Sequence, residues 1–194
     1  PGGIPEREKI RTYRRILVPV DLSSGCLTTC RVALGLAENL HGEIMLVHVY
    51  EDPLELTERV KETASFEKYR EEVQAHFEEK ARADMEKFTT GLKEQLQAEK
   101  VTAARLHYRL LHGDYYTELL REAENYRPEI IILGTNDSSE KEGLLDENAR
   151  LSIIRNSRFP VLVVPQKSDF IPGREIRVVY ATDFLDKDFS SLRQ

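Results

Sequence analysis

Five short runs of apolar, often β-branched residues alternate with segments of helical spacing, and this alternation limits the folds open to the chain. The runs lie near residues 15–21, 43–50, 102–111, 129–134 and 160–165. Most are apolar on both faces, which is typical of strands covered by helices on both sides. Strands that alternate with helices favour a parallel sheet, because a parallel connection needs a long crossover. We therefore predict an α/β domain with a parallel sheet.

The segments between these runs carry apolar residues every three or four positions, as amphipathic helices do. The longest spans about residues 62–98; its apolar positions are Phe66, Tyr69, Val73, Phe77, Ala81, Met85, Phe88, Leu92 and Leu96. A coiled-coil partner helix is one interpretation. A crossover helix is favoured, because a strand pattern lies on either side. Ser23 or Ser24 is predicted to cap the first helix, and Gly42 to end it in a left-handed conformation.

The pattern predicts one complete domain with additions at both ends. Residues 1–13 are expected to form an N-terminal arm, and residues 14–166 the domain itself. After a linker at 167–174, residues 175–194 repeat the layout of the first strand, a basic residue, an apolar run and then Asp. Because 194 residues hold one domain of this kind and not two, we interpret this tail as the first strand of a second, incomplete copy.

The net charge and the hydropathy pattern argue against several classes of partner. The formal net charge is −6 at pH 7, so non-specific attraction to nucleic acid or to an anionic membrane is not expected. No apolar run approaches the roughly 18 residues of a membrane span, and the first residues lack the apolar stretch of a signal peptide. We expect a cytoplasmic protein without nucleic-acid or membrane partners.

The two cysteines, Cys26 and Cys30, are four residues apart and are expected on one helix face. A redox or metal pair is one interpretation. Two small buried hydrophobic side chains are favoured, since no further Cys and no nearby His completes a zinc site. Asp137, Glu140 and Asp146 have the chemistry of a hard-cation site, but a solvated loop is the favoured interpretation. No catalytic constellation is recognised, so we predict neither an enzyme nor a metal site.

Ligands of an open parallel sheet bind beyond the carboxyl ends of its strands, where the strand order reverses. Three stretches of this chain are expected to meet there: Pro19-Val20-Asp21, Val47-His48-Val49 and the loop 134–148. The sequence therefore places the candidate ligand site at this edge.

Five motifs, taken in order, resemble the universal stress protein family. They are Ile16-Leu17-Val18-Pro19-Val20-Asp21, Val47-His48-Val49, His112-Gly113-Asp114, Ile131-Ile132-Leu133-Gly134-Thr135 and Phe159-Pro160-Val161-Leu162-Val163-Val164-Pro165. The resemblance covers about residues 15–165. It implies a Rossmann-like α/β fold with an open five-stranded parallel sheet, in the order 3-2-1-4-5, and helices on both faces. The fifth strand and the strand expected at 175–182 are apolar and lie at or beyond an edge of this sheet, and exposed edges favour association. We therefore expect a homodimer, or pairing with a second stress-protein domain of the same chain.

Many members of that family bind ATP through a Gly-x2-Gly-x9-Gly-Ser/Thr motif before the last helix. Gly134 matches the first glycine, but Asp137 and Glu147 occupy the next two glycine positions and Asn148 the hydroxyl position. Glycines let backbone N–H groups approach phosphate oxygens closely. A carboxylate about 5 Å from a phosphate charge instead costs roughly 3 kcal/mol at an effective dielectric near 20. The motif is therefore degenerate, and ATP is expected to bind weakly or not at all.

Asp21 matches the family residue that contacts the adenosine end of the nucleotide. An equally weighted interpretation is that Asp21 only ends a strand and caps the next turn. The cofactor-binding residues that the resemblance implies for ATP or another adenine nucleotide are Pro19, Val20, Asp21, Val47, Gly113, Gly134, Asn136, Asn148 and Pro160.

The resemblance favours a non-enzymatic binding and signalling module of the stress response. The alternative is an ATP-binding switch that hydrolyses ATP slowly, with its site in this domain or in the missing copy. A third and more distant hypothesis is an ATP pyrophosphatase. Residues 23–28 of this chain faintly resemble the Ser-Gly-Gly loop of those enzymes. Leu27 stands where that loop carries an acidic residue, which argues against the third hypothesis.

Overall fold

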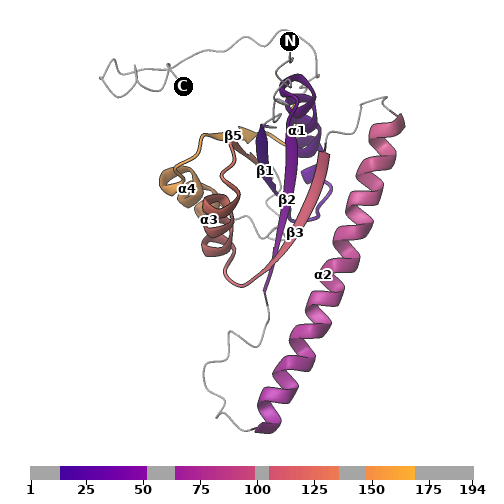
Figure 1. Ribbon diagram of the computed structural model, residues 1–194, viewed down its shortest axis with the longest axis vertical. Coiled ribbons are helices and arrows are strands. Elements are labelled where there is room, and N and C mark those ends of the chain that lie inside the picture. Colours follow the sequence, from indigo (N-terminus) through magenta and orange to yellow (C-terminus); the bar gives the residue numbers. More distant parts are fainter. Residues whose placement is uncertain (1–13, 52–63, 99–104, 136–146, 169–194) are drawn as a thin grey trace, which may run out of the picture.

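The computed structural model describes residues 14–51, 64–98, 105–135 and 147–168 (Figure 1). Along them lie β1 (Arg15–Pro19), α1 (Cys26–Leu40), β2 (Glu43–Tyr50), α2 (Ala64–Ala98), β3 (Arg105–His112), α3 (Tyr115–Tyr126), β4 (Ile130–Gly134), α4 (Glu147–Asn156) and β5 (Val161–Val164). The strands form one sheet in the order β3-β2-β1-β4-β5, and all four neighbouring pairs are parallel. The predicted fold class and strand order are confirmed.

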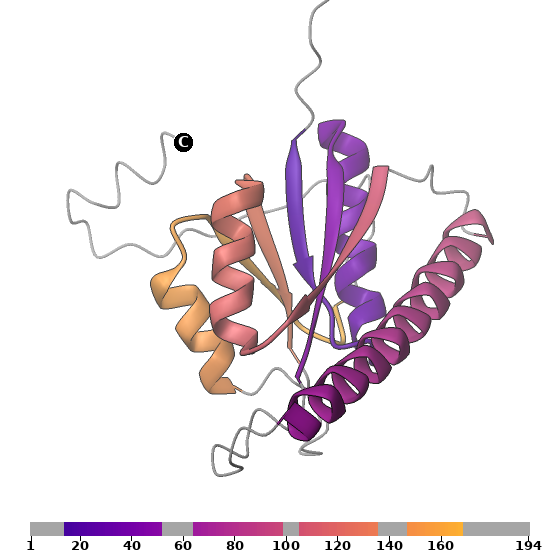
Figure 2. The ribbon, with the colours of Figure 1, turned by 60° about the horizontal axis from the view of Figure 1, so that its bottom comes forward.

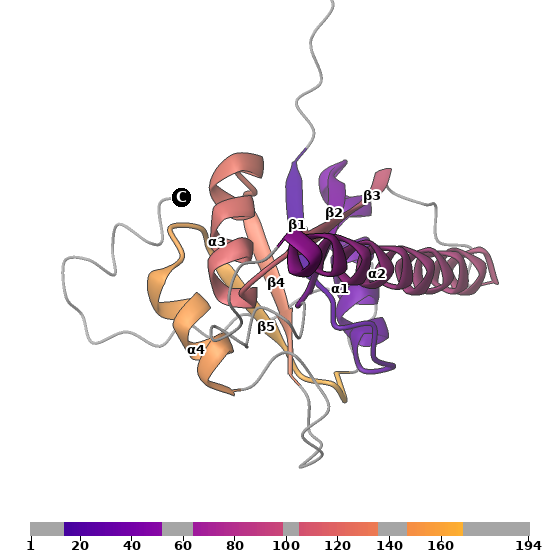
Figure 3. The ribbon, with the colours of Figure 1, turned by 90° about the horizontal axis from the view of Figure 1, so that it is seen from below.

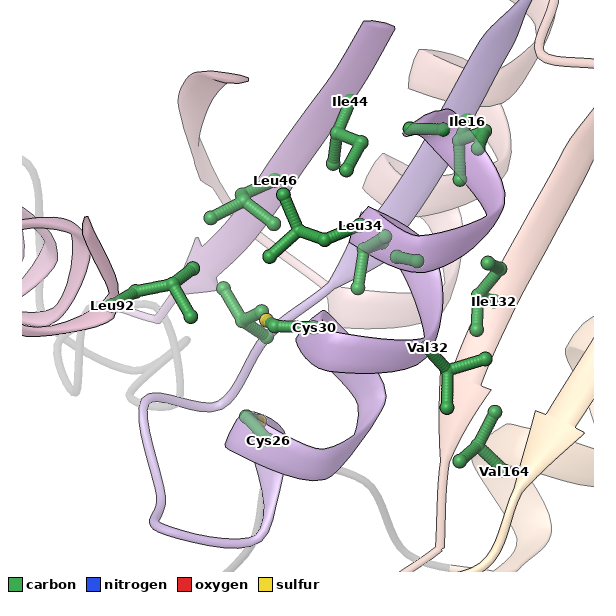
Figure 4. Close-up of a cluster of buried hydrophobic side chains, with 14 of the residues drawn as sticks. Ile16, Cys26, Cys30, Val32, Leu34, Ile44, Leu46, Leu92, Ile132 and Val164 are labelled. Carbon is green, nitrogen blue, oxygen red and sulfur yellow. The ribbon is translucent and has the colours of Figure 1, made fainter. Parts of the chain in front are cut away.

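Helices cover both faces of the sheet. Helices α1 and α2 lie on one face and α3 and α4 on the other (Figures 2 and 3). The side chains of each strand alternate between the two faces, so the sheet divides the core into two clusters. In the first cluster, Leu34 of α1 and Leu92 of α2 pack beside Ile16 and Leu46 of the sheet (Figure 4). In the second, Leu119 of α3 and Ile153 of α4 are fully buried.

Helix α2 is much longer than the sheet that it crosses. Its 35 residues extend for about 52 Å at 1.5 Å per residue, whereas the eight residues of β2 extend for about 27 Å. The later part packs on the sheet, where Met85 and Leu92 are buried. The first part projects beyond the carboxyl ends of the strands (Figure 1), and Tyr69 there is 55% exposed. The helix predicted over 62–98 is confirmed for 64–98, as is its crossover role, and residues 62 and 63 lie outside the described residues.

Two details of α1 differ from the sequence prediction. Gly25 occupies the N-cap position and no side chain caps the helix, so the predicted cap by Ser23 or Ser24 is wrong. At the other end His41, with φ of 52°, adopts the left-handed conformation expected for Gly42. Gly42 has a different role, because a Cβ there would come within 2.8 Å of the carbonyl oxygen of Arg14. A glycine is needed at residue 42 because the backbone of Arg14 passes close to it, and not because residue 42 adopts a left-handed conformation.

The predicted N-terminal arm, the linker beyond residue 168 and the strand of a second copy at 175–194 lie outside the described residues. The division into domains therefore stays a prediction. None of the described helices combines the length and the apolar character needed to cross a membrane.

Candidate functional site

The end of β1 brings the first predicted site residues to the carboxyl edge of the sheet. Pro19 is the last residue of β1. The backbone N–H of Val20 donates to the carbonyl oxygen of Val47 at 2.8 Å, and both valine side chains are fully buried in the core. His48 is also buried, and its Nδ1 donates to the Val20 carbonyl at 2.9 Å. Asp21 is therefore the first residue of this stretch with a partly exposed side chain.

Asp21 organises the turn that leads into α1. Its Oδ1 accepts a hydrogen bond from the backbone N–H of Ser23 at 3.0 Å and another from the thiol of Cys26 at 2.8 Å. The N–H of Asp21 donates back to Cys26 Sγ at 3.4 Å. Leu22, between them, has a φ of 63°, which is unusual for a bulky residue. The turn-capping interpretation of Asp21 is thus supported, with Cys26 as a partner that the sequence did not indicate.

Cys26 is held in its protonated form. Burial raises the pKa of its thiol to about 12, and the nearby Asp21 carboxylate contributes to the same shift. Burial also raises the pKa of Cys30, which is 1% exposed. A protonated thiol is a poor nucleophile and a poor metal ligand, and within the described ranges no group of His, Cys, Asp and Glu could hold a metal ion. The interpretation of both cysteines as small buried side chains is consistent with this environment.

The segment that joins β3 to α3 brings further residues to the carboxyl edge of the sheet. Gly113 follows β3 with a φ of 125°, a conformation that favours glycine. Asp114 caps α3 by accepting from the N–H of Thr117 at 2.8 Å. Tyr115 is buried, and in the described part of the chain its hydroxyl makes no hydrogen bond. Nothing in the sequence marked Tyr115 as part of this edge.

Tyr115 lies within electrostatic reach of the turn after β1. Burial raises the pKa of its hydroxyl, and the negative charge of Asp21, joined at high pH by that of an ionised Cys26, raises it further. Arg150, from the first turns of α4, acts on the same pKa in the opposite direction. Asp21, Cys26 and Tyr115 therefore form one polar cluster at the carboxyl edge, contributed by the turn after β1 and by α1 and α3.

The remaining predicted site residues are divided between the two edges of the sheet. Gly134 ends β4 and packs against Thr29 of α1. Asn148 lies in the first turn of α4, whereas Asn136 and the acidic positions 137, 140 and 146 lie outside the described residues. Pro160 precedes β5, at the amino edge, where its carbonyl accepts from the N–H of Ile131. The structure does not bring Pro160 to the cluster around Asp21.

The cluster has the chemistry of a binding site. It offers the partly exposed carboxylate of Asp21, which accepts hydrogen bonds. Within the cluster a nucleophile, Cys26, lies beside a base, Asp21, but the raised pKa of the thiol disfavours the thiolate that attack requires. Aromatic rings lie nearby at the ends of β2 and β3, where the centroids of Tyr50 and His112 are 5.3 Å apart.

Comparisons with family models, curated proteins and solved structures all relate this chain to the same family. The family model described as the universal stress protein family matches residues 12–165. A curated relative, the universal stress protein MJ0531 of Methanocaldococcus jannaschii, is 22% identical over 152 residues, which are 78% of this chain and 82% of the relative.

Two solved structures show the same fold. The universal stress protein UspA from Lactobacillus plantarum is 19% identical, with a TM-score of 0.55 over 78% of this chain and 97% of that one. The universal stress protein from Archaeoglobus fulgidus in complex with dAMP is 15% identical, with a TM-score of 0.52 over 78% of this chain and 97% of that one.

Proposed function

This chain belongs to the universal stress protein family, and on that premise we propose that it is a non-enzymatic stress-response module that binds the adenosine part of a nucleotide at Asp21. The observation that carries the proposal is the position of Asp21, a partly exposed carboxylate at the carboxyl edge of β1. Sites of open parallel sheets lie at this edge. The dAMP complex of the similar protein from Archaeoglobus fulgidus supports an adenine nucleotide as the ligand class.

We propose further that the site has little affinity for the triphosphate. Glu147 stands at the position of the third motif glycine and is the first residue of α4. Glutamate carries a negative charge where the motif has an uncharged glycine, and like charges repel a phosphate. Asp137 adds a second negative charge to the loop before α4. A nucleotide with one phosphate is the better fit to this charge distribution.

The module is proposed to work as a pair of such domains. In the described residues the outer edge of β5 has no partner strand, and an unpaired strand edge favours association. Val163 of β5 is a large apolar residue that is 38% exposed, and α4 carries two more, Leu151 and Ile154. A homodimer that joins two β5 edges would cover Val163.

Calorimetric titration with AMP and with ATP, each with and without magnesium, tests the nucleotide proposal. We expect ATP to bind no more tightly than AMP, and the change Asp21→Ala to weaken AMP at least about tenfold, the effect of a lost hydrogen bond to a charged group. Asp114→Ala is the matched control, since Asp114 also anchors a turn at this edge through its carboxylate. It should lose stability but keep AMP affinity.

The paired change Asp137→Gly and Glu147→Gly tests the explanation for weak triphosphate binding. Removing both carboxylates should strengthen ATP binding more than AMP binding, because ATP carries more negative charge than AMP. Submicromolar ATP binding by the unchanged protein would contradict the proposal and favour the ATP-dependent switch. No change in ATP affinity in the double variant would show that charge at these positions is not the cause.

A further inference from the structure

We propose that Cys26 is a positioning residue that fixes the Asp21 carboxylate in the orientation needed for nucleotide binding. The inference rests on the proposed function of Asp21 and adds a determinant that lies outside the glycine motif. It assigns no chemistry to the sulfur atom. Cys26 acts through Asp21, and it controls how tightly the site holds its ligand.

The geometry gives Cys26 two contacts with the same residue. Its thiol donates to Asp21 Oδ1 at 2.8 Å, and its sulfur accepts from the backbone N–H of Asp21 at 3.4 Å. One contact restrains the carboxylate and the other restrains the backbone that carries it. A side chain that is restrained in this way loses less conformational entropy when a ligand binds. Removal of the thiol would therefore weaken the ligand even if Asp21 itself were unchanged.

Cys26 is well suited to hold Asp21 because its own position is fixed. It is the first residue of α1 and is 7% exposed. The same helix is anchored in the core by Ala33 and Leu34. The turn that carries Asp21 contains Leu22 in a left-handed conformation, which is costly for a bulky side chain and persists only where its surroundings impose it. The bonds from Cys26 and from Ser23 are part of what imposes it.

The chemistry of the thiol keeps this contact in place over the physiological pH range. Since the pKa of Cys26 is raised to about 12, the sulfur keeps its proton at neutral pH and can donate it to a carboxylate. The hydroxyl of a serine has the same combination of one donor with acceptor lone pairs. Ser should therefore substitute for Cys at residue 26, whereas Ala should not.

Cys30 provides an internal control. It lies one turn later on α1 and is more deeply buried than Cys26. Of the two cysteines, Cys26 is the one with described hydrogen bonds to Asp21. Cys26→Ala and Cys30→Ala both remove one buried sulfur atom, so a role limited to packing would give both variants the same behaviour. A positioning role separates them.

The test is calorimetric titration of AMP into the unchanged protein and into Cys26→Ala, Cys26→Ser and Cys30→Ala. We expect Cys26→Ala to lower AMP affinity by about fivefold to tenfold, in the range of one ordinary hydrogen bond. Cys26→Ser should stay within about twofold of the unchanged protein, because its hydroxyl keeps both the donor and the acceptor. Cys30→Ala should keep its affinity while losing thermal stability.

A spectroscopic measurement tests the same conclusion without a change at Cys26. The chain has two cysteines, so the S–H stretching region of its Raman spectrum contains two bands, and Cys30→Ala assigns them. AMP should shift the Cys26 band and leave the Cys30 band in place.

The possible outcomes separate this inference from the proposed function. Absence of AMP binding to the unchanged protein overturns the proposed function and the positioning role together. Equal AMP affinities of the unchanged protein and Cys26→Ala overturn the positioning role alone. Equal losses in Cys26→Ala and Cys30→Ala, without rescue by Cys26→Ser, assign both cysteines to packing. An AMP-saturated protein with an unshifted Cys26 band also overturns the positioning role.

Discussion

The hydroxyl oxygen of Thr29 on α1 lies so close to the Cα atom of Gly134 at the end of β4 that a Cβ atom on residue 134 would overlap it. Thr29 is buried at this contact. The contact lets α1 approach the sheet closely beside the candidate site. Packing against Thr29 therefore favours a glycine at residue 134, which is also the first glycine of the motif. Its presence is not in itself evidence for phosphate binding.

Gly134→Ala should lower the free energy of unfolding by about 1–3 kcal/mol, the usual cost of overpacking a core contact. Thr29→Ala removes the overlapping oxygen, so the double variant should regain part of that loss in a double-mutant cycle. Gly91→Ala is the control: nothing lies within 4 Å of a Cβ at this helical position. Denaturant unfolding of each variant measures the effect. Equal stabilities of Gly134→Ala and the unchanged protein would show that α1 can shift to make room.

The raised thiol pKa values predict that the protein becomes less stable in alkaline solution. The pKa of Cys26 is raised from 9.0 to about 12 in the folded state, so its contribution is fully present below about pH 9 and is lost as the pH rises toward 12. In that range the unfolded chain gives up the proton and the folded chain keeps it, and linkage then favours unfolding. Cys30 and Tyr115 act in the same direction.

Urea unfolding at a series of pH values between about 7.5 and 10.5 should show this decline in the unchanged protein. Cys26→Ser has no thiol to ionise at residue 26, so its stability should decline less steeply. Parallel curves for the two proteins would show that Cys26 has the same pKa in both states.

Tyr115, which is buried, and Tyr126, which is half-buried, should respond differently to the loss of their hydroxyl groups. Tyr115→Phe removes a hydroxyl without a described hydrogen bond, so the free energy of unfolding should stay the same or rise by about 1 kcal/mol. The Tyr126 hydroxyl donates to Glu43 at 3.3 Å. Tyr126→Phe should therefore lower the free energy of unfolding by about 0.5–1.5 kcal/mol. Thermal unfolding of both variants makes the comparison. A clear loss of stability in Tyr115→Phe would reveal a partner of its hydroxyl.

The proposed pairing through β5 predicts that a charge at its exposed edge gives a monomer. Val163 is 38% exposed, and Val163→Lys would bring two cations together across a symmetric β5 contact, where like charges are unfavourable. Leu40→Lys is the control, because Leu40 is also exposed and lies at the end of α1, on the other face of the sheet. Sedimentation velocity should find a dimer for the unchanged protein and for Leu40→Lys. A monomeric unchanged protein at high concentration would contradict the pairing.

The sequence by itself determined the sheet and its helices. Strand runs such as residues 130–134 are apolar throughout, and the only way to bury such a run on both faces is to cover it with helices. The spacing of Met85 and Leu92 likewise specified one face of a long helix. The edge that carries Asp21 follows too, because the strands are parallel and the ligand edge is the one where they end. The same reasoning applied to Pro160, which precedes its strand, would have placed it at the opposite edge.

The tertiary structure alone decided how the side chains at that edge meet. The bond between Cys26 and Asp21 depends on a turn in which Leu22 adopts a left-handed conformation, and no periodic pattern encodes such a turn. The approach of Tyr115 joins residues that are more than ninety positions apart in the sequence. Hydrophobic periodicity records which face of an element is buried, because burial acts on each residue independently. The direction of a hydrogen bond or the overlap of two atoms depends on the relative placement of whole elements, and packing sets that placement only when the chain has folded.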